Sequence, residues 1–187
     1  MSSHNEHPVK NNLISRIKNN TGVNIYKCYQ CGKCSAGCPV AYDEMEYPPS
    51  MIMRLLQTED KQNEVLVKKS YAIWVCLTCE MCFTRCPMEI DIPTVMDYVR
   101  QESLQEKIIH PKAKRIVASH KAFINSIRKT GRLHEMGFVM EYKLTTGNLT
   151  QDIFLAPKMF EKGKLHILAE KIKDTALMAR IFKRTKK

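Results

Sequence analysis

The positions of the cysteines constrain this sequence more than any other feature. All eight cysteines of the 187 residues fall in two short runs, Cys28, Cys31, Cys34 and Cys38, then Cys76, Cys79, Cys82 and Cys86. Each cysteine of the first run recurs 48 positions later, and each run reads C-x2-C-x2-C-x3-C-P. An aromatic residue, Tyr26 or Trp74, stands two positions before each run. The sequence therefore contains an internal repeat of two similar units.

This spacing is typical of iron-sulfur cluster ligation. Three cysteines at three-residue steps reach three corners of a [4Fe-4S] cluster, and in two-cluster proteins the fourth cysteine of each run binds the other cluster. We therefore predict two [4Fe-4S] clusters and no catalytic residue. The predicted ligands are Cys28, Cys31, Cys34 and Cys86 for the first cluster, and Cys76, Cys79, Cys82 and Cys38 for the second.

Zinc and disulfides are the alternatives for the same cysteines. Zinc modules use C-x2-C pairs separated by a long segment, rather than three cysteines at equal steps. Residues 1–10 lack the apolar region of a secretory signal, so we expect a cytoplasmic protein with reduced thiols. The longest apolar stretch, residues 71–77, falls far short of the ~20 residues that cross a bilayer, which predicts no transmembrane segment.

The remaining sequence predicts an all-α chain. Apolar residues recur at helical spacing in residues 11–20, 50–56, 61–70, 93–107, 111–131 and 165–182, whereas β alternation is missing. This excludes the small β-α-β type of ferredoxin. We expect an N-terminal segment with a short helix (1–20), an α-helical ferredoxin domain binding both clusters (21–110), and a basic helical C-terminal extension for subunit docking (111–187).

Several finer predictions accompany these helices. We expect Ser50 to be an N-cap and Val65 and Leu66 to face inward. The helix after Pro111 is expected to end at Gly131 and to bury one apolar face. That face consists of Ile116, Val117, His120, Phe123, Ile124 and Ile127. Gly137, Gly147, Pro157 and Gly163 are expected to divide the following residues into short pieces.

The charge is unevenly distributed. The chain has 30 Lys and Arg against 19 Asp and Glu, a net charge of +11. Residues 1–100 hold 11 of each sign, so the whole excess lies in residues 101–187. Two oxidised clusters, each of formal charge about −2 with its thiolates, would make the first part negative. The basic part then suggests an acidic neighbouring subunit. A nucleic-acid module remains the alternative, and it predicts steeply salt-dependent binding.

The cysteine domain resembles a known family. The two runs and the segment that follows them resemble the C subunit of heterodisulfide reductase from methanogenic archaea, over roughly residues 20–110. The resemblance rests on Ala36-Gly37-Cys38-Pro39, Thr84-Arg85-Cys86-Pro87 and Ile90-Asp91-Ile92-Pro93. The domain is also similar to the helical ferredoxin domain of succinate dehydrogenase and fumarate reductase. Those proteins, unlike this one, carry an additional [2Fe-2S] domain and have a three-iron cluster on one run.

The resemblance implies a role in electron transfer. Electrons would pass from a flavin-containing A subunit to a catalytic B subunit, which reduces the coenzyme M-coenzyme B heterodisulfide in methanogenesis. A hydrogenase or formate dehydrogenase would be a further partner in a larger complex. The B subunit's Cys-Cys-Gly motif does not occur here. The alternative is the same role in a related complex, such as thiol:fumarate reductase, a heterodisulfide-reductase-like sulfur enzyme or a membrane-associated dehydrogenase.

Overall fold

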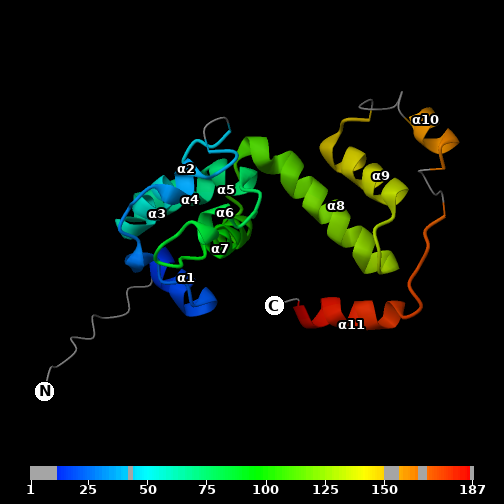
Figure 1. Cartoon of the computed structure of the whole chain (residues 1–187). Helices are drawn as coiled ribbons and strands as arrows, with labels where there is room; N and C mark the ends of the chain where they lie inside the picture. The colour runs from blue at the N-terminus through cyan, green and yellow to red at the C-terminus, as the bar shows by residue number, and fades with distance from the viewer. Residues whose placement is uncertain (1–11, 42–43, 150–155, 164–167, 186–187) are drawn as a thin grey trace, which may run out of the picture. The chain divides into compact units, whose positions relative to one another are not determined.

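A computed structural model describes residues 12–41, 44–149, 156–163 and 168–185, and every regular element within these ranges is a helix (Figure 1). The all-α prediction is thus confirmed. The chain forms two compact units, Met1–Ala113 and Lys114–Lys187. The first contains α1 (Leu13–Thr21), η1 (Ile25–Lys27), α2 (Lys33–Ala36), α3 (Pro49–Gln57), α4 (Lys61–Lys69), α5 (Ala72–Val75), α6 (Met81–Thr84), α7 (Ile92–Gln105) and η2 (Pro111–Ala113). The second contains α8 (Lys114–Thr130), α9 (Glu135–Thr146), α10 (Ala156–Glu161) and α11 (Thr175–Thr185).

Helix α1 forms where its sequence predicts a helix. The Asn12 side chain accepts a hydrogen bond from the Ser15 amide and caps the helix, and Gly22 ends it in the left-handed conformation. The apolar stripe is buried and packs toward α3 and α7; it consists of Leu13, Ile14 and Ile17. Helix α1 is therefore part of the core of the first unit. Residues 1–11 lie outside the described residues.

Helix α3 starts earlier than expected. Pro48 is its N-cap and Pro49 occupies the first turn, where the missing proline N–H costs no hydrogen bond. The prediction of Ser50 as N-cap is therefore wrong. The Ser50 amide instead donates to the Ser35 hydroxyl at 2.8 Å, and the two hydroxyls are 2.7 Å apart. This contact ties α3 to α2, the short helix inside the first cysteine run.

Helix α4 buries a different face from the one predicted. Val65 and Leu66 are each 39% exposed, while Glu64 and Lys68 are buried. Glu64 accepts a hydrogen bond of 2.7 Å from the Leu13 amide, and Lys68 pairs with Glu106. Burial of charged groups is tolerated when they are paired or hydrogen-bonded. Both partners are distant in sequence, so apolar periodicity alone could not reveal this face.

Helix α7 contacts α1, α4, α5 and α6 within the first unit (Figure 1). Asp91 caps it by accepting a hydrogen bond from the Thr94 amide at 3.0 Å, and Pro93 lies in its first turn, as predicted for a helix opened by that proline. Val95, Met96 and Val99 are completely buried. Helix α7 therefore links the N-terminal helix to both short helices of the second cysteine run.

In the second unit, α8 packs against α9 and α11. Helix α8 ends at Gly131, as predicted, but its buried face consists mainly of small residues: Val117, Ala118, Ala122, Ser126 and Thr130. Phe123 and Ile124 are 42% and 46% exposed, so their predicted burial is wrong. Small side chains let neighbouring backbones approach closely. The aromatic Phe123 instead meets Phe138 of α9 edge to face.

Two boundaries in this unit also differ from expectation. Gly137 lies within α9, where its amide donates to Nδ1 of the capping residue His134. The last helix begins at Thr175 rather than near residue 165, since Asp174 accepts a hydrogen bond from the Leu177 amide. The Ile172 amide bonds to the Thr130 carbonyl instead of continuing a helix. Residues 164–167 lie outside the described residues. None of the described helices is both long and apolar enough to cross a membrane.

Candidate metal centres

The two cysteine runs have the same backbone conformation. Each begins at the end of a short helix, η1 or α5, and its third cysteine lies in a second short helix, α2 or α6. Between the first three cysteines, Gln30 and Gly32 have positive φ, and so do their counterparts Thr78 and Glu80. Non-glycine residues in this region are strained by about 1–2 kcal/mol each. The internal repeat is therefore a repeat of a strained loop as well as of sequence.

The exposure of the cysteines follows the same repeat. The first and fourth cysteines of each run are half-buried, the second is exposed and the third is buried. None of the eight forms a disulfide. Because the third cysteines, Cys34 and Cys82, lie on the contacting helices α2 and α6, the two loops meet at their buried ends. Each loop thus directs one thiol inward and one toward the surface.

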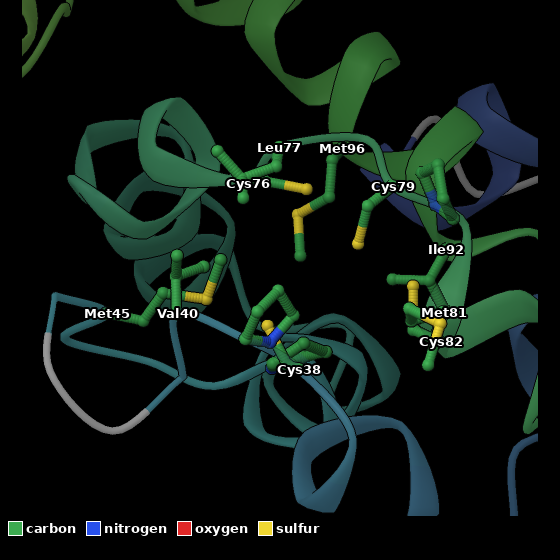
Figure 2. A pocket seen from close by; sticks show the side chains of 13 residues that line it. Cys38, Val40, Met45, Cys76, Leu77, Cys79, Met81, Cys82, Ile92 and Met96 are labelled. Atoms are coloured by element: carbon green, nitrogen blue, oxygen red, sulfur yellow. The ribbon is translucent and has the colours of Figure 1, made fainter.

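One cavity contains thiols from both runs. It is lined by Cys38 of the first run and by Cys76, Cys79 and Cys82 of the second. In Figure 2 these four residues stand on different sides of the cavity. The remaining walls are mostly apolar and include Val40, Met45, Leu77, Ile92 and Met96. These are the four cysteines predicted for the second cluster. The fold brings Cys38 beside the other three, although residues 39–75 separate it from Cys76 in the sequence.

Three members of the other predicted set lie near Tyr29. The pKa of the Tyr29 hydroxyl is raised, first by desolvation, then by a hydrogen bond with Cys31 and by the nearby thiols of Cys31, Cys86 and Cys28. Cys34 lies close enough to Cys28 for the charge of Cys28 to raise its pKa in addition to the larger effect of burial. Cys28, Cys31 and Cys86 therefore lie near the Tyr29 hydroxyl, and Cys34 lies near Cys28.

The donor set fits a cationic iron core. Burial, with a smaller contribution from the Cys76 charge, raises the pKa of the Cys82 thiol to about 12, and burial also raises that of Cys76. Thiolates in such surroundings need a compensating positive charge, which cluster iron supplies. Within the described part of the chain, no three potential ligands converge on a single ion. The ligands of a cubane bind separate irons and stand around a larger volume.

Two side chains outside the runs hold corresponding points of the two loops. Gln57, at the end of α3, donates through Nε2 to the carbonyls of Ile25 (3.1 Å) and Cys28 (2.8 Å). Arg100 of α7 donates to the carbonyls of Ile73 and Cys76, the residues 48 positions later. We call these contacts the Gln57 clamp and the Arg100 clamp. Sequence reasoning missed both because the clamping residues lie outside the repeat.

The fourth cysteines have contacts of their own. Cys86 Sγ accepts a hydrogen bond of 3.4 Å from the Ile90 amide. Arg85, the residue before Cys86, covers Gly37, the residue before Cys38, so closely that a Cβ on Gly37 would overlap the Arg85 side chain. Gly37 and Arg85 occupy equivalent positions of the repeat. A Cβ at position 37 would therefore have to displace the flexible end of the Arg85 side chain.

The two aromatic residues that precede the runs differ in environment. Trp74 is 5% exposed and packs in the core of the first unit. Tyr26 is 47% exposed, and its hydroxyl donates to Glu59 at 2.8 Å. The two equivalent positions therefore differ, because one side chain is buried and the other makes a polar contact at the surface.

Comparison with known proteins identifies the cysteine domain. The family described as the 4Fe-4S dicluster domain matches residues 24–90. This match indicates two [4Fe-4S] clusters, and the segment contains all eight cysteines.

Curated proteins that are similar to this chain are named as C subunits of heterodisulfide reductases. The iron-sulfur C subunit of CoB-CoM heterodisulfide reductase from Methanopyrus kandleri is 34% identical over 51% of this chain and 47% of its own length. The C subunit of the H2:CoB-CoM heterodisulfide,ferredoxin reductase from Methanothermobacter thermautotrophicus is 27% identical over 62% and 57%, respectively. The chain spans about half the length of these relatives. Residues 24–90 thus match the 4Fe-4S dicluster domain, within a chain similar to the C subunits of heterodisulfide reductases.

Proposed function

We propose that each cluster is bound by three cysteines of one run and the fourth of the other. The first set is Cys28, Cys31, Cys34 and Cys86, and the second is Cys76, Cys79, Cys82 and Cys38. The shared cavity of the second set and the grouping of three members of the first around Tyr29 support this assignment. The known ligation pattern of the motif supports it as well.

Paired serine substitutions test the assignment. If ligation crosses between the runs, Cys38→Ser with Cys79→Ser damages one cluster and leaves the other intact, whereas Cys31→Ser with Cys38→Ser damages both. Ligation within each run predicts the opposite results. Iron content and the EPR signals of the dithionite-reduced, anaerobically purified chains distinguish the two. One intact cluster in the Cys31/Cys38 double variant would refute crossed ligation.

We propose that the chain is an electron-transfer subunit of a CoB-CoM heterodisulfide reductase. It would carry electrons from a flavin-containing subunit to the catalytic subunit that reduces the heterodisulfide to two thiols. The observation that carries the proposal is the presence of two four-cysteine runs in one helical domain similar to the heterodisulfide reductase C subunits. When bound, such clusters supply one-electron transfer.

The chain's own residues contribute positioning and exclusion of water. The strained loops hold the thiols in place, the two clamps fix the backbone at the first cysteine of each run, and apolar side chains such as Met96 and Ile92 wall the cavity. Cys31 and Cys79 remain exposed. Because transfer between proteins requires close approach, these exposed edges are suited to exchange electrons with neighbouring subunits. Cysteines that bind iron rather than form disulfides suit a reducing compartment, and we propose that the chain lies in the cytoplasm.

Anaerobic affinity purification of the tagged chain from its native cells tests the function. We expect a flavoprotein and a thiol-active subunit to copurify, and the complex to reduce the CoM-CoB heterodisulfide. Reduction of fumarate or oxidation of sulfur compounds by the purified complex, without heterodisulfide reduction, would instead identify a related complex. Steeply salt-dependent binding of DNA, without partner proteins, would contradict both.

We further propose that the basic second unit docks this chain to a neighbouring subunit. All of the chain's excess positive charge lies in residues 101–187, and Arg180, Lys183 and Arg184 are on α11. Deletion of residues 174–187 is expected to weaken copurification of partners while leaving the iron content unchanged. Unchanged copurification after this deletion would oppose a docking role.

A further inference from the structure

The two loop clamps are equivalent in position but not in charge. The Gln57 clamp holds Ile25 and Cys28 through a neutral amide, and the Arg100 clamp holds Ile73 and Cys76 through a guanidinium. Each clamp reaches the backbone of the first cysteine of its run. The repeat therefore places a permanent positive charge beside one loop and only a dipole beside the other.

The positive charge of Arg100 is shielded from water. Its side chain is 15% exposed, and its ion-pair partner Asp97, at 2.7 Å, is 53% exposed. Water and salt therefore screen the carboxylate of Asp97 more than the guanidinium of Arg100. The guanidinium also points two of its nitrogen atoms toward the loop carbonyls and only one toward Asp97. A net positive potential at the Cys76 loop follows from this asymmetry.

Other cations near the cysteines do not create the same difference. Lys33 lies in the first run and is exposed, so solvent screens its charge. Arg85 is also exposed and lies between the fourth cysteines, next to Cys86 in sequence and against Gly37, the residue before Cys38. Under crossed ligation these cysteines belong to different clusters, so Arg85 is shared between them. Lys27, next to Cys28 in sequence, is exposed as well, so within the described residues Arg100 is the shielded cation that distinguishes the loops.

We propose that Arg100 raises the reduction potential of the cluster held by the Cys76 loop relative to that of the cluster held by the Cys28 loop. A positive charge stabilises the reduced cluster, which carries one more negative charge than the oxidised cluster. When the chain holds a single electron at equilibrium, that electron therefore resides preferentially on the cluster at the Cys76 loop. The cluster at the Cys28 loop is then oxidised. This inference rests on the ligand sets proposed above. It makes Arg100 a positioning residue that also tunes the potential, with no role in binding substrate.

The decisive variant is Arg100→Gln, which gives the second loop the same kind of clamp as the first. Opposite charges within about 4–6 Å shift a titrating group's equilibrium tenfold or more. Arg100 contacts the loop carbonyls, and Asp97 balances part of its charge. We therefore expect the low end of this range. The reduced-to-oxidised ratio of one cluster at a fixed potential should fall about tenfold, equivalent to about 59 mV for a one-electron couple.

The measurement is an EPR-monitored redox titration of the full, anaerobically purified chain. Arg54→Gln is the matched control, because it removes the same charge from an exposed site on α3 outside either clamp. Arg100→Lys keeps the charge and is expected to restore most of the potential. The reciprocal variant, Gln57→Arg, is expected to raise the other midpoint. Iron content measured on every variant confirms that both clusters have assembled.

The outcomes separate this inference from the proposed function. A lowered midpoint for one cluster in Arg100→Gln, retained at high salt and absent in Arg54→Gln, supports it. Two assembled clusters with unchanged midpoints in Arg100→Gln overturn it while leaving the electron-transfer role standing. Equal shifts in Arg100→Gln and Arg100→Lys would also overturn it, since they would show that clamp geometry rather than charge sets the potential. Absence of clusters in the unaltered chain would overturn the proposed function itself.

Discussion

The pair between Lys68 of α4 and Glu106, at the end of α7, gives a sharp prediction about the fold that supports the cysteine loops. The Lys68 side chain is 6% exposed, and its Nζ lies 2.5 and 2.6 Å from the two Glu106 carboxylate oxygens. Glu106 is 41% exposed. Substitution Glu106→Ala leaves the buried ammonium without this carboxylate. The perturbation reaches the site because α7 carries both Met96 and Arg100.

The expected cost lies between two known limits. Removing one partner of a fully buried ion pair costs about 3–5 kcal/mol. An exposed pair contributes about 0–1 kcal/mol. Because one end of this pair is buried and the other is partly hydrated, we expect Glu106→Ala to lower the free energy of unfolding by about 2 kcal/mol, midway between these limits. Lys68→Met removes the buried charge while keeping most of its volume, and we expect it to cost less than about 1 kcal/mol.

Thermal unfolding followed by circular dichroism under anaerobic conditions measures these effects. For a unit of this size, about 2 kcal/mol corresponds to a drop in Tm of roughly 10 °C. The exposed neighbour Lys69 provides the control, since Lys69→Met should change Tm little. If Lys68→Met destabilises the chain as much as Glu106→Ala, the loss of stability comes from packing of the lysine stem rather than from an unpaired charge. That result would refute the prediction.

Three glycines give further predictions. Gly37→Ala should displace Arg85 and cost about 1 kcal/mol, the low end for overpacking because the arginine is flexible, and Arg85→Ala in the same chain should restore Tm. Gly131→Ala combines positive φ with a clash against the Ile172 side chain, so it should destabilise the second unit and speed proteolysis near α11. Gly147→Ala, at a similar φ in open space, should show only the conformational cost of about 1–2 kcal/mol. Equal effects of Gly131→Ala and Gly147→Ala would exclude a contribution from the Ile172 contact.

The sequence contained the chemistry of the site but not its supports. The eight cysteines and their 48-residue repeat predicted two clusters, and Gly131 predicted the end of α8. These features depend on neighbours within a few residues. The predicted buried faces of α4 and α8 were wrong. The packing of α4 depends on Glu106, and that of α8 depends on close contact with other helices. Periodicity favours large apolar residues and overlooks buried charges and small side chains.

The clamps illustrate the same limit within the site. Gln57 and Arg100 are ordinary polar residues on helices, and no spacing rule relates them to the cysteines. Their role depends on tertiary contact with carbonyls 29 and 24 residues from the clamping residue, at Cys28 and Cys76. Positive φ at Thr78 and Glu80 was equally hidden, because neither residue type signals that conformation. The thiol ligands follow a local motif, whereas the environment that tunes them does not.

The content of iron and acid-labile sulfide in the anaerobically purified chain tests the central claim most directly. Two [4Fe-4S] clusters require about eight of each per chain, all released together by denaturation. After reduction, an EPR signal from two interacting [4Fe-4S] clusters would support the same conclusion. Two zinc ions per chain without sulfide would contradict the account, because the eight thiols would then form structural zinc sites that cannot carry electrons.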